Sequence, residues 1–151
     1  MSTRVHSRRI AISSAAAALA LAACGGLGDG GEALSVSLVF PTDALLSLPT
    51  DGGKLSVELW SSPQPPQRGD DAVQMRFRDK SGALVSGLTI SVVPWMPAHG
   101  HGTSVKPIVT EPEPGVYVAA PVYLFMAGAW QLITTISGPV DDTVAPTLDI
   151  P

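Results

Sequence analysis

The amino-acid sequence predicts an all-β fold, an immunoglobulin-like antiparallel β-sandwich of about seven strands. The first observation is composition: fourteen prolines and fifteen glycines in 151 residues indicate many short elements joined by turns. The second is a period of two in successive short apolar runs bounded by Gly, Pro or Asp, which is typical of antiparallel strands with one buried face. No window after residue 24 has a convincing helical period. About seven such runs in roughly a hundred residues fit a sandwich of this type.

The clear alternating runs begin at residue 54. Residues 34–40, before them, fit either an early strand or an ordered part of a tether. Residues 79–82, Asp-Lys-Ser-Gly, read as a turn between the second and third runs. The apolar positions of the six runs are Leu55, Val57 and Leu59; Val73, Met75 and Phe77; Leu88, Ile90 and Val92; Val116, Val118 and Ala120; Trp130, Leu132, Thr134 and Ile136; and Leu148 and Ile150.

Residues 1–23 have the pattern of a secretory signal rather than of a folded element. Three arginines form a basic leader, and residues 10–23 form a small apolar run without acids. The run is too short for a stable transmembrane span. We therefore expect the folded part of the chain to follow this segment.

The apolar run ends in Leu21-Ala22-Ala23-Cys24, which resembles the signal of bacterial lipoproteins, where the cysteine becomes the lipidated first residue. We therefore expect Cys24 to be lipidated and the chain to be extracytoplasmic, held at a membrane by acyl chains. Gly25 after the cysteine, in place of Asp, favours the outer membrane in a two-membraned cell. The alternative is an ordinary signal peptide with an accidental cysteine.

The expected organisation has three parts: a signal in residues 1–23, the lipidated cysteine and a flexible tether in 24–50, and one β-sandwich domain in 51–151. The glycine-rich residues 25–31 would span about 15 Å as a coil. Without the signal, six basic residues stand against thirteen acidic ones, a net charge of −7. Such a charge argues against nucleic acid as a partner and against binding an anionic bilayer by charge, so the expected membrane contact is the lipid anchor.

The strongest candidate site is the histidine loop, residues 94–102. His99 and His101 are the only histidines after residue 23, and residues two apart in an extended stretch point to the same side. Imidazole suits copper and zinc, and a thioether such as that of Met96 moves the preference toward Cu(I). The pattern predicts a soft copper site. The alternative is a tight structural turn, with the imidazoles bonded to carbonyls and the methionine packed in the core.

Strand order predicts which other segments lie near the histidine loop. In an up-and-down chain every second connection lies at the same end of the sandwich. Residues 61–71, 96–103 and 125–128 therefore belong at one end. This placement makes Met126 a neighbour of Met96 and a further candidate ligand.

Three segments of this sequence resemble the YtkA-like domain family: Met96-Pro97-Ala98-His99-Gly100-His101-Gly102, Gly115-Val116-Tyr117 and Met126-Ala127-Gly128-Ala129-Trp130. The turn at residues 79–87 fits as well, and the resemblance covers about residues 54–150 in order. It implies a small extracytoplasmic bacterial domain with an immunoglobulin-like sandwich, related to the FixH-type proteins of copper-oxidase assembly. It also implies an envelope or oxidase-assembly protein as a partner. The candidate metal ligands that it implies are Met96, His99, His101 and Met126.

Other chemistry is poorly represented in the sequence. There is no Gly-x-Ser-x-Gly, no phosphate loop and no credible nucleophile–base pair, so we expect a binding domain and not an enzyme. The pairs Asp70-Asp71 and Asp141-Asp142 are expected in turns, with too few oxygens for calcium. Trp60, Trp95 and Trp130 are expected in the core or at its rim. The alternative function is a non-metal structural or protein-interaction module of the cell envelope.

Overall fold

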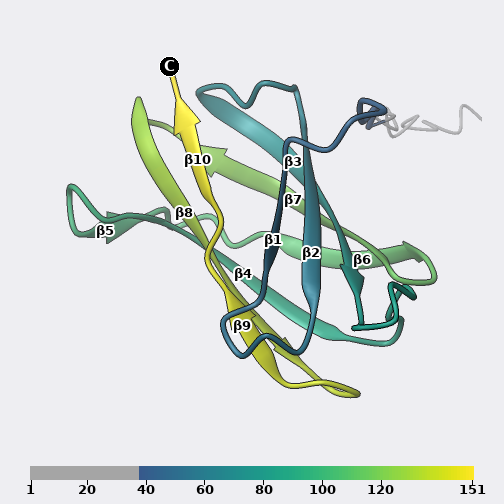
Figure 1. The fold of residues 1–151 in the computed structure, drawn as a ribbon. Coiled ribbons are helices and arrows are strands. Elements are labelled where there is room, and N and C mark those ends of the chain that lie inside the picture. Colours follow the sequence, from purple (N-terminus) through teal and green to yellow (C-terminus); the bar gives the residue numbers. More distant parts are fainter. Residues whose placement is uncertain (1–37) are drawn as a thin grey trace, which may run out of the picture. The chain divides into compact units, whose positions relative to one another are not determined.

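The computed structural model describes residues 38–151, which form two antiparallel β-sheets (Figure 1). Within these residues no helix is long and apolar enough to cross a membrane. The layout confirms the predicted all-β, immunoglobulin-like sandwich. One sheet has the strand order β1 (Leu46–Pro49), β2 (Ser56–Ser62), β3 (Gly69–Arg78), β7 (Val116–Leu124) and β6 (Ile108–Glu113). The other has the order β10 (Thr147–Ile150), β8 (Gly128–Ser137), β4 (Thr89–Met96) and β5 (His101–Gly102), with β9 (Asp142–Val144) paired to β8.

The six alternating runs of the sequence are all strands: β2, β3, β4, β7, β8 and β10. The structure adds β1, β5, β6 and β9, which the sequence did not predict. These strands are two to six residues long, and β6 contains Pro112, so a period of two has no room to develop. Residues 38–40, at the end of the possible early strand, form no strand.

The fold includes residues that the sequence analysis placed in the tether. β1 pairs with β2 along its whole length, and both Leu46 and Leu48 pack against the core. The folded part therefore begins before residue 51. The signal in residues 1–23, Cys24 and the tether as far as residue 37 lie outside the described residues.

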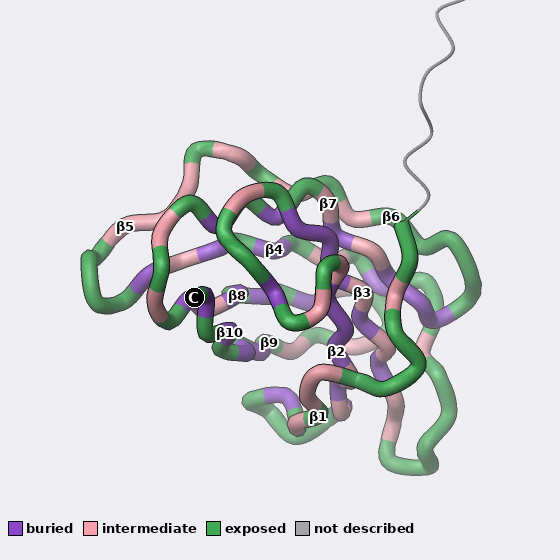
Figure 2. Tube along the Cα trace, turned by 90° about the horizontal axis from the view of Figure 1, so that it is seen from above, coloured by how far each residue is buried: buried purple, intermediate pink, exposed green. Residues whose placement is uncertain are grey.

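The core lies between the two sheets, and buried residues recur along β2, β3, β4, β7, β8 and β10 (Figure 2). In β2, β3, β4, β8 and β10 the apolar positions of the alternating runs point into this core. In β7 the predicted face is wrong: Tyr117 and Ala119 are in the core, whereas Val118 and Ala120 lie on the other face, because both faces of this strand carry apolar residues. Fully burying a side chain of this size contributes about 1.5–3 kcal/mol, so the alternation supplies most of the driving force for folding. The largest fully buried side chains include Leu59, Met75, Phe77, Tyr117, Trp130, Leu132 and Ile136.

Tyr117 of β7 fastens the connection between β3 and β4 to the sandwich. Its hydroxyl donates to the carbonyl of Val85 at 2.9 Å and accepts from the backbone N–H of Leu88 at 3.0 Å. Its ring meets that of Phe77 edge-on, with 5.8 Å between ring centres. Burial is the main cause that raises the pKa of this phenol. The side chain is 1% exposed, so its two hydrogen bonds lie where water cannot replace them.

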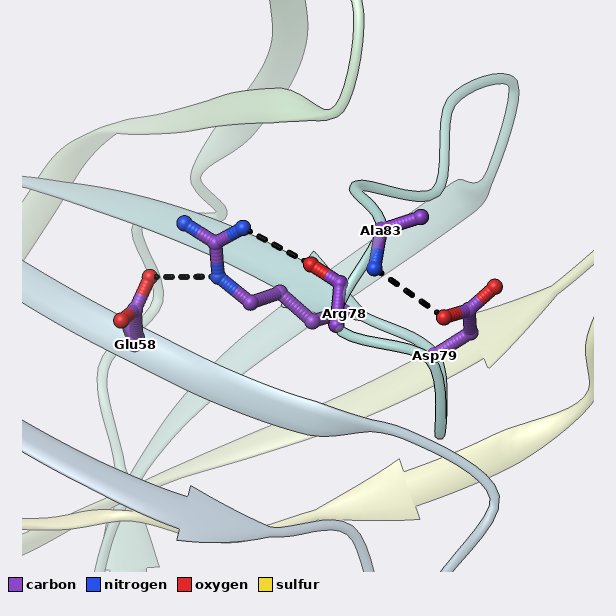
Figure 3. A network of polar contacts seen from close by, with 5 residues as sticks. Glu58, Arg78, Asp79 and Ala83 are labelled. Carbon is purple, nitrogen blue, oxygen red and sulfur yellow. Dashed lines mark hydrogen bonds and ion pairs between the residues drawn. The ribbon is translucent and has the colours of Figure 1, made fainter.

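The same connection starts at the predicted turn, which Asp79 holds together. Its Oδ1 accepts a hydrogen bond from the hydroxyl of Ser81 at 2.6 Å. It also accepts one from the backbone N–H of Ala83 at 3.1 Å (Figure 3). These bonds, that of the Ser81 hydroxyl first, lower the pKa of Asp79. Beside the turn, Arg78 of β3 pairs with Glu58 of β2 at 3.1 Å. The turn thus depends on the local Asx hydrogen bonding that its sequence predicts.

Asp142 joins β9 to the turn between β1 and β2. Its carboxylate accepts hydrogen bonds from the hydroxyl of Thr50 and the N–H of Gly52, each at 2.7 Å. It also accepts from the N–H groups of Thr143 at 2.8 Å and Lys54 at 3.2 Å. These bonds, that of Thr50 first, lower the pKa of Asp142 to about 2. The carboxylate is therefore a structural acceptor whose bonding capacity is used within the fold.

Candidate functional site

The histidine loop lies where β4 ends and β5 begins, on a hairpin that projects from the sandwich (Figures 1 and 2). Met96, the last residue of β4, is the ladder partner of His101, the first residue of β5. Between them, the backbone N–H groups of His99 and Gly100 donate to the carbonyl of Met96 at 3.2 and 3.0 Å. Gly100 has a φ of 65°, which glycine adopts without steric cost. The hairpin therefore fixes the spacing of the two histidines.

The imidazole rings of His99 and His101 lie beside one another. Their centres are 5.7 Å apart and their planes are inclined by 42°. Two imidazoles that share one ion have ring centres within about 6 Å, because each metal–nitrogen bond is about 2 Å long. The observed spacing is compatible with a shared ion.

The two histidines differ in their surroundings. His99 is exposed, and its imidazole makes no hydrogen bond within residues 38–151. His101 is half-buried, with its Nδ1 3.3 Å from the carbonyl oxygen of Gly102. A carbonyl oxygen only accepts, so a hydrogen bond at this contact places the proton on Nδ1 and leaves the Nε2 lone pair available. In the alternative of a tight structural turn, both imidazoles would be bonded to carbonyls. In the structure only His101 has such a contact, and only through one of its nitrogens.

His101 belongs to an aromatic cluster with Tyr123, Phe125 and Trp130. The ring of Phe125 stacks on that of His101, with 5.6 Å between centres and 18° between planes. Trp130 meets His101 edge-on at 6.3 Å and Phe125 edge-on at 5.4 Å. Tyr123 in turn stacks on Phe125 at 5.9 Å. The cluster joins the histidine loop to the connection between β7 and β8, which is the juxtaposition that strand order predicts.

Both candidate methionines lie at this end of the sandwich, packed against protein. Met96 is 2% exposed, and its terminal methyl group lies 2.8 Å from where a Cβ on Gly128 would stand. Because Met96 and His101 are ladder partners, their side chains lie on the same face of the sheet. Met126 is half-buried against the core, and its carbonyl accepts a hydrogen bond from Nε1 of Trp130 at 2.9 Å. At this end of the sandwich the two thioethers are therefore buried or half-buried, and the two imidazoles are more accessible.

The proline-rich connection, residues 61–71, reaches this end through β3. Asp70 is the ladder partner of Tyr123, so the start of β3 lies next to the aromatic cluster. Pro65 and Pro66 instead line a separate groove of about 240 Å³ with Leu45 and neighbouring residues. This connection therefore approaches the aromatic cluster through the start of β3, and Pro65 and Pro66 line a different groove.

Asp70 and Asp71 lie in β3, so their expected place in a turn is wrong. Asp71 is the ladder partner of the buried Val122, and the register shifts between Asp71 and Val73. Asp71 is 4% exposed. Its Oδ2 accepts a hydrogen bond from the N–H of Gln67 at 3.2 Å. Burial raises the pKa of Asp71 to about 6, with the neighbouring Asp70 adding to the rise and the Gln67 bond opposing it. The available signal was the alternation itself: Asp71 lies two residues before Val73 and so on the same face of β3, which the sequence analysis did not extend past Val73.

Within residues 38–151, no three His, Cys, Asp or Glu side chains come together. The donors available at the histidine loop are two imidazoles and the nearby thioethers. The sequence identified all four of these side chains but did not identify Phe125. The one available signal was its position beside Met126, in the connection that strand order places next to the histidines.

Comparison with known proteins gives three results. The sequence model described as YtkA-like matches residues 52–135, which is more than half of the chain and includes the four candidate ligands. No curated protein matches the sequence. Among solved structures, the crystal structure of a DUF4426 family protein from Pseudomonas aeruginosa PAO1 is similar with a TM-score of 0.47 and 12% sequence identity. That similarity covers 65% of this chain and 91% of the other.

Proposed function

Since this chain belongs to the YtkA-like family of extracytoplasmic domains, we propose that it binds one copper ion, with Cu(I) favoured, at the histidine loop. His99 and His101 would supply nitrogen donors, and Met96 and Met126 would supply thioether sulfur. Soft thioethers select Cu(I), whereas Mg²⁺ and Ca²⁺ prefer oxygen. The exposed position of the loop would let the ion pass to an envelope or oxidase-assembly protein.

One observation carries the proposal: the two imidazoles lie 5.7 Å apart, with the buried thioether of Met96 on the same face as His101. The contact from Nδ1 of His101 to Gly102 supports it, because it leaves Nε2 as the free donor atom. A blue-copper centre does not fit, since it needs a cysteine thiolate and the chain has only Cys24. The donor set fits a site that binds copper and releases it.

The anchor is part of the same proposal. Lipidation of Cys24 would hold the domain at a membrane, the outer one in a two-membraned cell, through the tether that precedes the fold. The variant Cys24→Ala should no longer incorporate a labelled fatty acid and should no longer be found in the membrane fraction. Labelling that persists in this variant would contradict the proposed anchor.

Copper binding is tested by competition. The full chain, purified in detergent, is titrated against a chromophoric Cu(I) chelator, beside a His99→Ala/His101→Ala double variant and a Lys106→Ala control. We expect the wild-type chain and Lys106→Ala each to withdraw one equivalent of Cu(I) from the chelator. The double variant should bind Cu(I) at least tenfold more weakly. Binding should weaken as the pH falls, because protons compete for the imidazole nitrogens. Equal uptake by all three proteins, or none by any, would overturn the proposal.

A second candidate function is a protein-interaction module without metal. Tyr123 and Phe125 are 36% and 39% exposed, and their rings form a stacked pair beside the histidine loop. Exposed aromatic side chains of this kind are enriched at protein interfaces. A partner captured in the presence of chelator by the double histidine variant, and lost from Tyr123→Ala/Phe125→Ala, would favour this function. We propose no enzymatic reaction for either candidate.

A further inference from the structure

The two candidate nitrogen ligands are held very differently by the fold. The ring of His101 has Phe125 on its face at 5.6 Å, the edge of Trp130 at 6.3 Å, and a carbonyl 3.3 Å from Nδ1. The exposed ring of His99 has one ring neighbour within the described residues, His101 itself. One imidazole is thus fixed before any ligand arrives, and the other can change rotamer at little cost.

Trp130 couples the fixed imidazole to the β7–β8 connection. Its side chain is fully buried in β8, so its position is set by the core. Its Nε1 donates to the carbonyl of Met126 at 2.9 Å, while its ring packs edge-on against both Phe125 and His101. A single rigid indole therefore sets the place of the backbone at Met126 relative to His101.

We infer that Phe125 and Trp130 are positioning residues that preorganise His101 and Met126 as the fixed half of the site, leaving His99 as the movable ligand through which the ion enters and leaves. This inference rests on the proposed function. Preorganisation matters because a ligand that is already ordered loses no conformational freedom when it binds. The partners that orient a metal-binding histidine commonly change metal affinity when they are replaced.

The test uses a matched pair of substitutions on the aromatic cluster. Phe125→Leu removes the ring that stacks on His101, whereas Tyr123→Leu removes a ring of similar exposure that stacks on Phe125. We expect Phe125→Leu to lower Cu(I) affinity by about three- to tenfold, the equivalent of one aromatic pair. Tyr123→Leu should stay within about twofold, and Phe125→Tyr should restore wild-type affinity because it keeps the stacked ring.

A readout on the metal-free protein separates positioning from a general loss of structure. In Phe125→Leu the NMR signals of the His101 ring protons should move, as the ring-current field of the phenyl group is lost. The signals of the distant Tyr117 ring should not move. Trp130→Phe keeps a ring in the core but removes the bond to Met126. This variant should weaken Cu(I) binding while its unfolding transition stays cooperative.

The outcomes distinguish this inference from the proposed function. If the wild-type protein and Phe125→Leu bind Cu(I) with the same affinity, the positioning role is wrong and the proposed copper site is not affected. Wild-type protein that binds no Cu(I) overturns both. Equal losses in Phe125→Leu and Tyr123→Leu also overturn the positioning role, because the effect then does not depend on contact with His101.

Discussion

The imidazole of His101 is stacked with the phenyl ring of Phe125, with 5.6 Å between ring centres and 18° between planes. His101 begins β5, and Phe125 lies in the connection between β7 and β8, so the contact joins the histidine loop to that connection. It gives the two histidines of the loop unequal roles, because the second is packed and the first is exposed. This inequality has consequences that can be measured.

Single substitutions of the two histidines should differ in their effect on stability. His101→Ala removes the contacts with Phe125 and Trp130 and should lower the free energy of unfolding by about 1 kcal/mol. His99→Ala, at an exposed position, should change it by less than about 0.5 kcal/mol. Urea unfolding of both metal-free variants at one pH measures the difference. Equal destabilisation would show that the ring contacts of His101 contribute nothing.

Tyr117→Phe should destabilise the domain by about 1–3 kcal/mol, because the buried N–H of Leu88 and the carbonyl of Val85 would both lose their partner. Tyr123→Phe is the matched control. It removes a hydroxyl from an exposed ring and should have almost no effect. Chemical unfolding followed by tryptophan fluorescence gives both values. A Tyr117→Phe variant as stable as the control would refute the fastening role of the hydroxyl.

Asp71 should make stability depend on pH between about 4 and 6. The pKa of this carboxyl is raised to about 6 by burial, so in this window the unfolded chain ionises while the folded chain stays protonated. Its contribution to the free energy of unfolding therefore falls as the pH rises through the window and is constant above it. Asp71→Asn keeps an acceptor for the N–H of Gln67 and does not titrate.

We expect Asp71→Asn to be more stable than wild type above pH 6, by at most about 3 kcal/mol, and the difference to shrink toward pH 4. Urea unfolding at pH 4, 5, 6 and 7 measures it, with Asp70→Asn on the exposed neighbouring carboxyl as control. A constant difference between the variant and wild type across these values would contradict the assignment.

The contribution of Asp142 to the free energy of unfolding should change with pH in the opposite direction to that of Asp71. The pKa of its carboxyl is lowered to about 2 by its hydrogen bonds, so its stabilising effect is complete above about pH 4 and is lost as the pH falls toward 2. Asp142→Ala should lower the free energy of unfolding at pH 7 by about 1–2 kcal/mol, since the hydroxyl of Thr50 and three backbone N–H groups lose a charged acceptor.

Acid unfolding of wild type and Asp142→Ala provides the measurement for this prediction, with Asp149→Ala at an exposed position of β10 as control. The two curves should converge near pH 2. A gap that is as large at pH 2 as at pH 7 would mean that the carboxylate charge is not what stabilises the turn.

Local alternation predicts six of the ten strands in residues 38–151 and the buried face of five of those six, β7 being the exception. Alternation at positions such as Val57 and Leu59 is a local property, because successive side chains of a strand point to opposite sides. The turn at Asp79 is equally local, since its bonds reach only residues two to four positions away. Strand order then sufficed to place Met126 at the same end of the sandwich as the histidine loop.

The way in which the candidate ligands are held depends on tertiary contacts that local patterns do not predict. The stack of Phe125 on His101 and the burial of Met96 against Gly128 each depend on residues brought together from different segments of the chain. The short β1 and β5 likewise exist because neighbouring strands offer them hydrogen bonds, not because of their own pattern. These features differ in the sequence separation of the residues involved. Period-two burial depends on residues that are close in the sequence, whereas ring contacts and register depend on how strands far apart in the sequence meet.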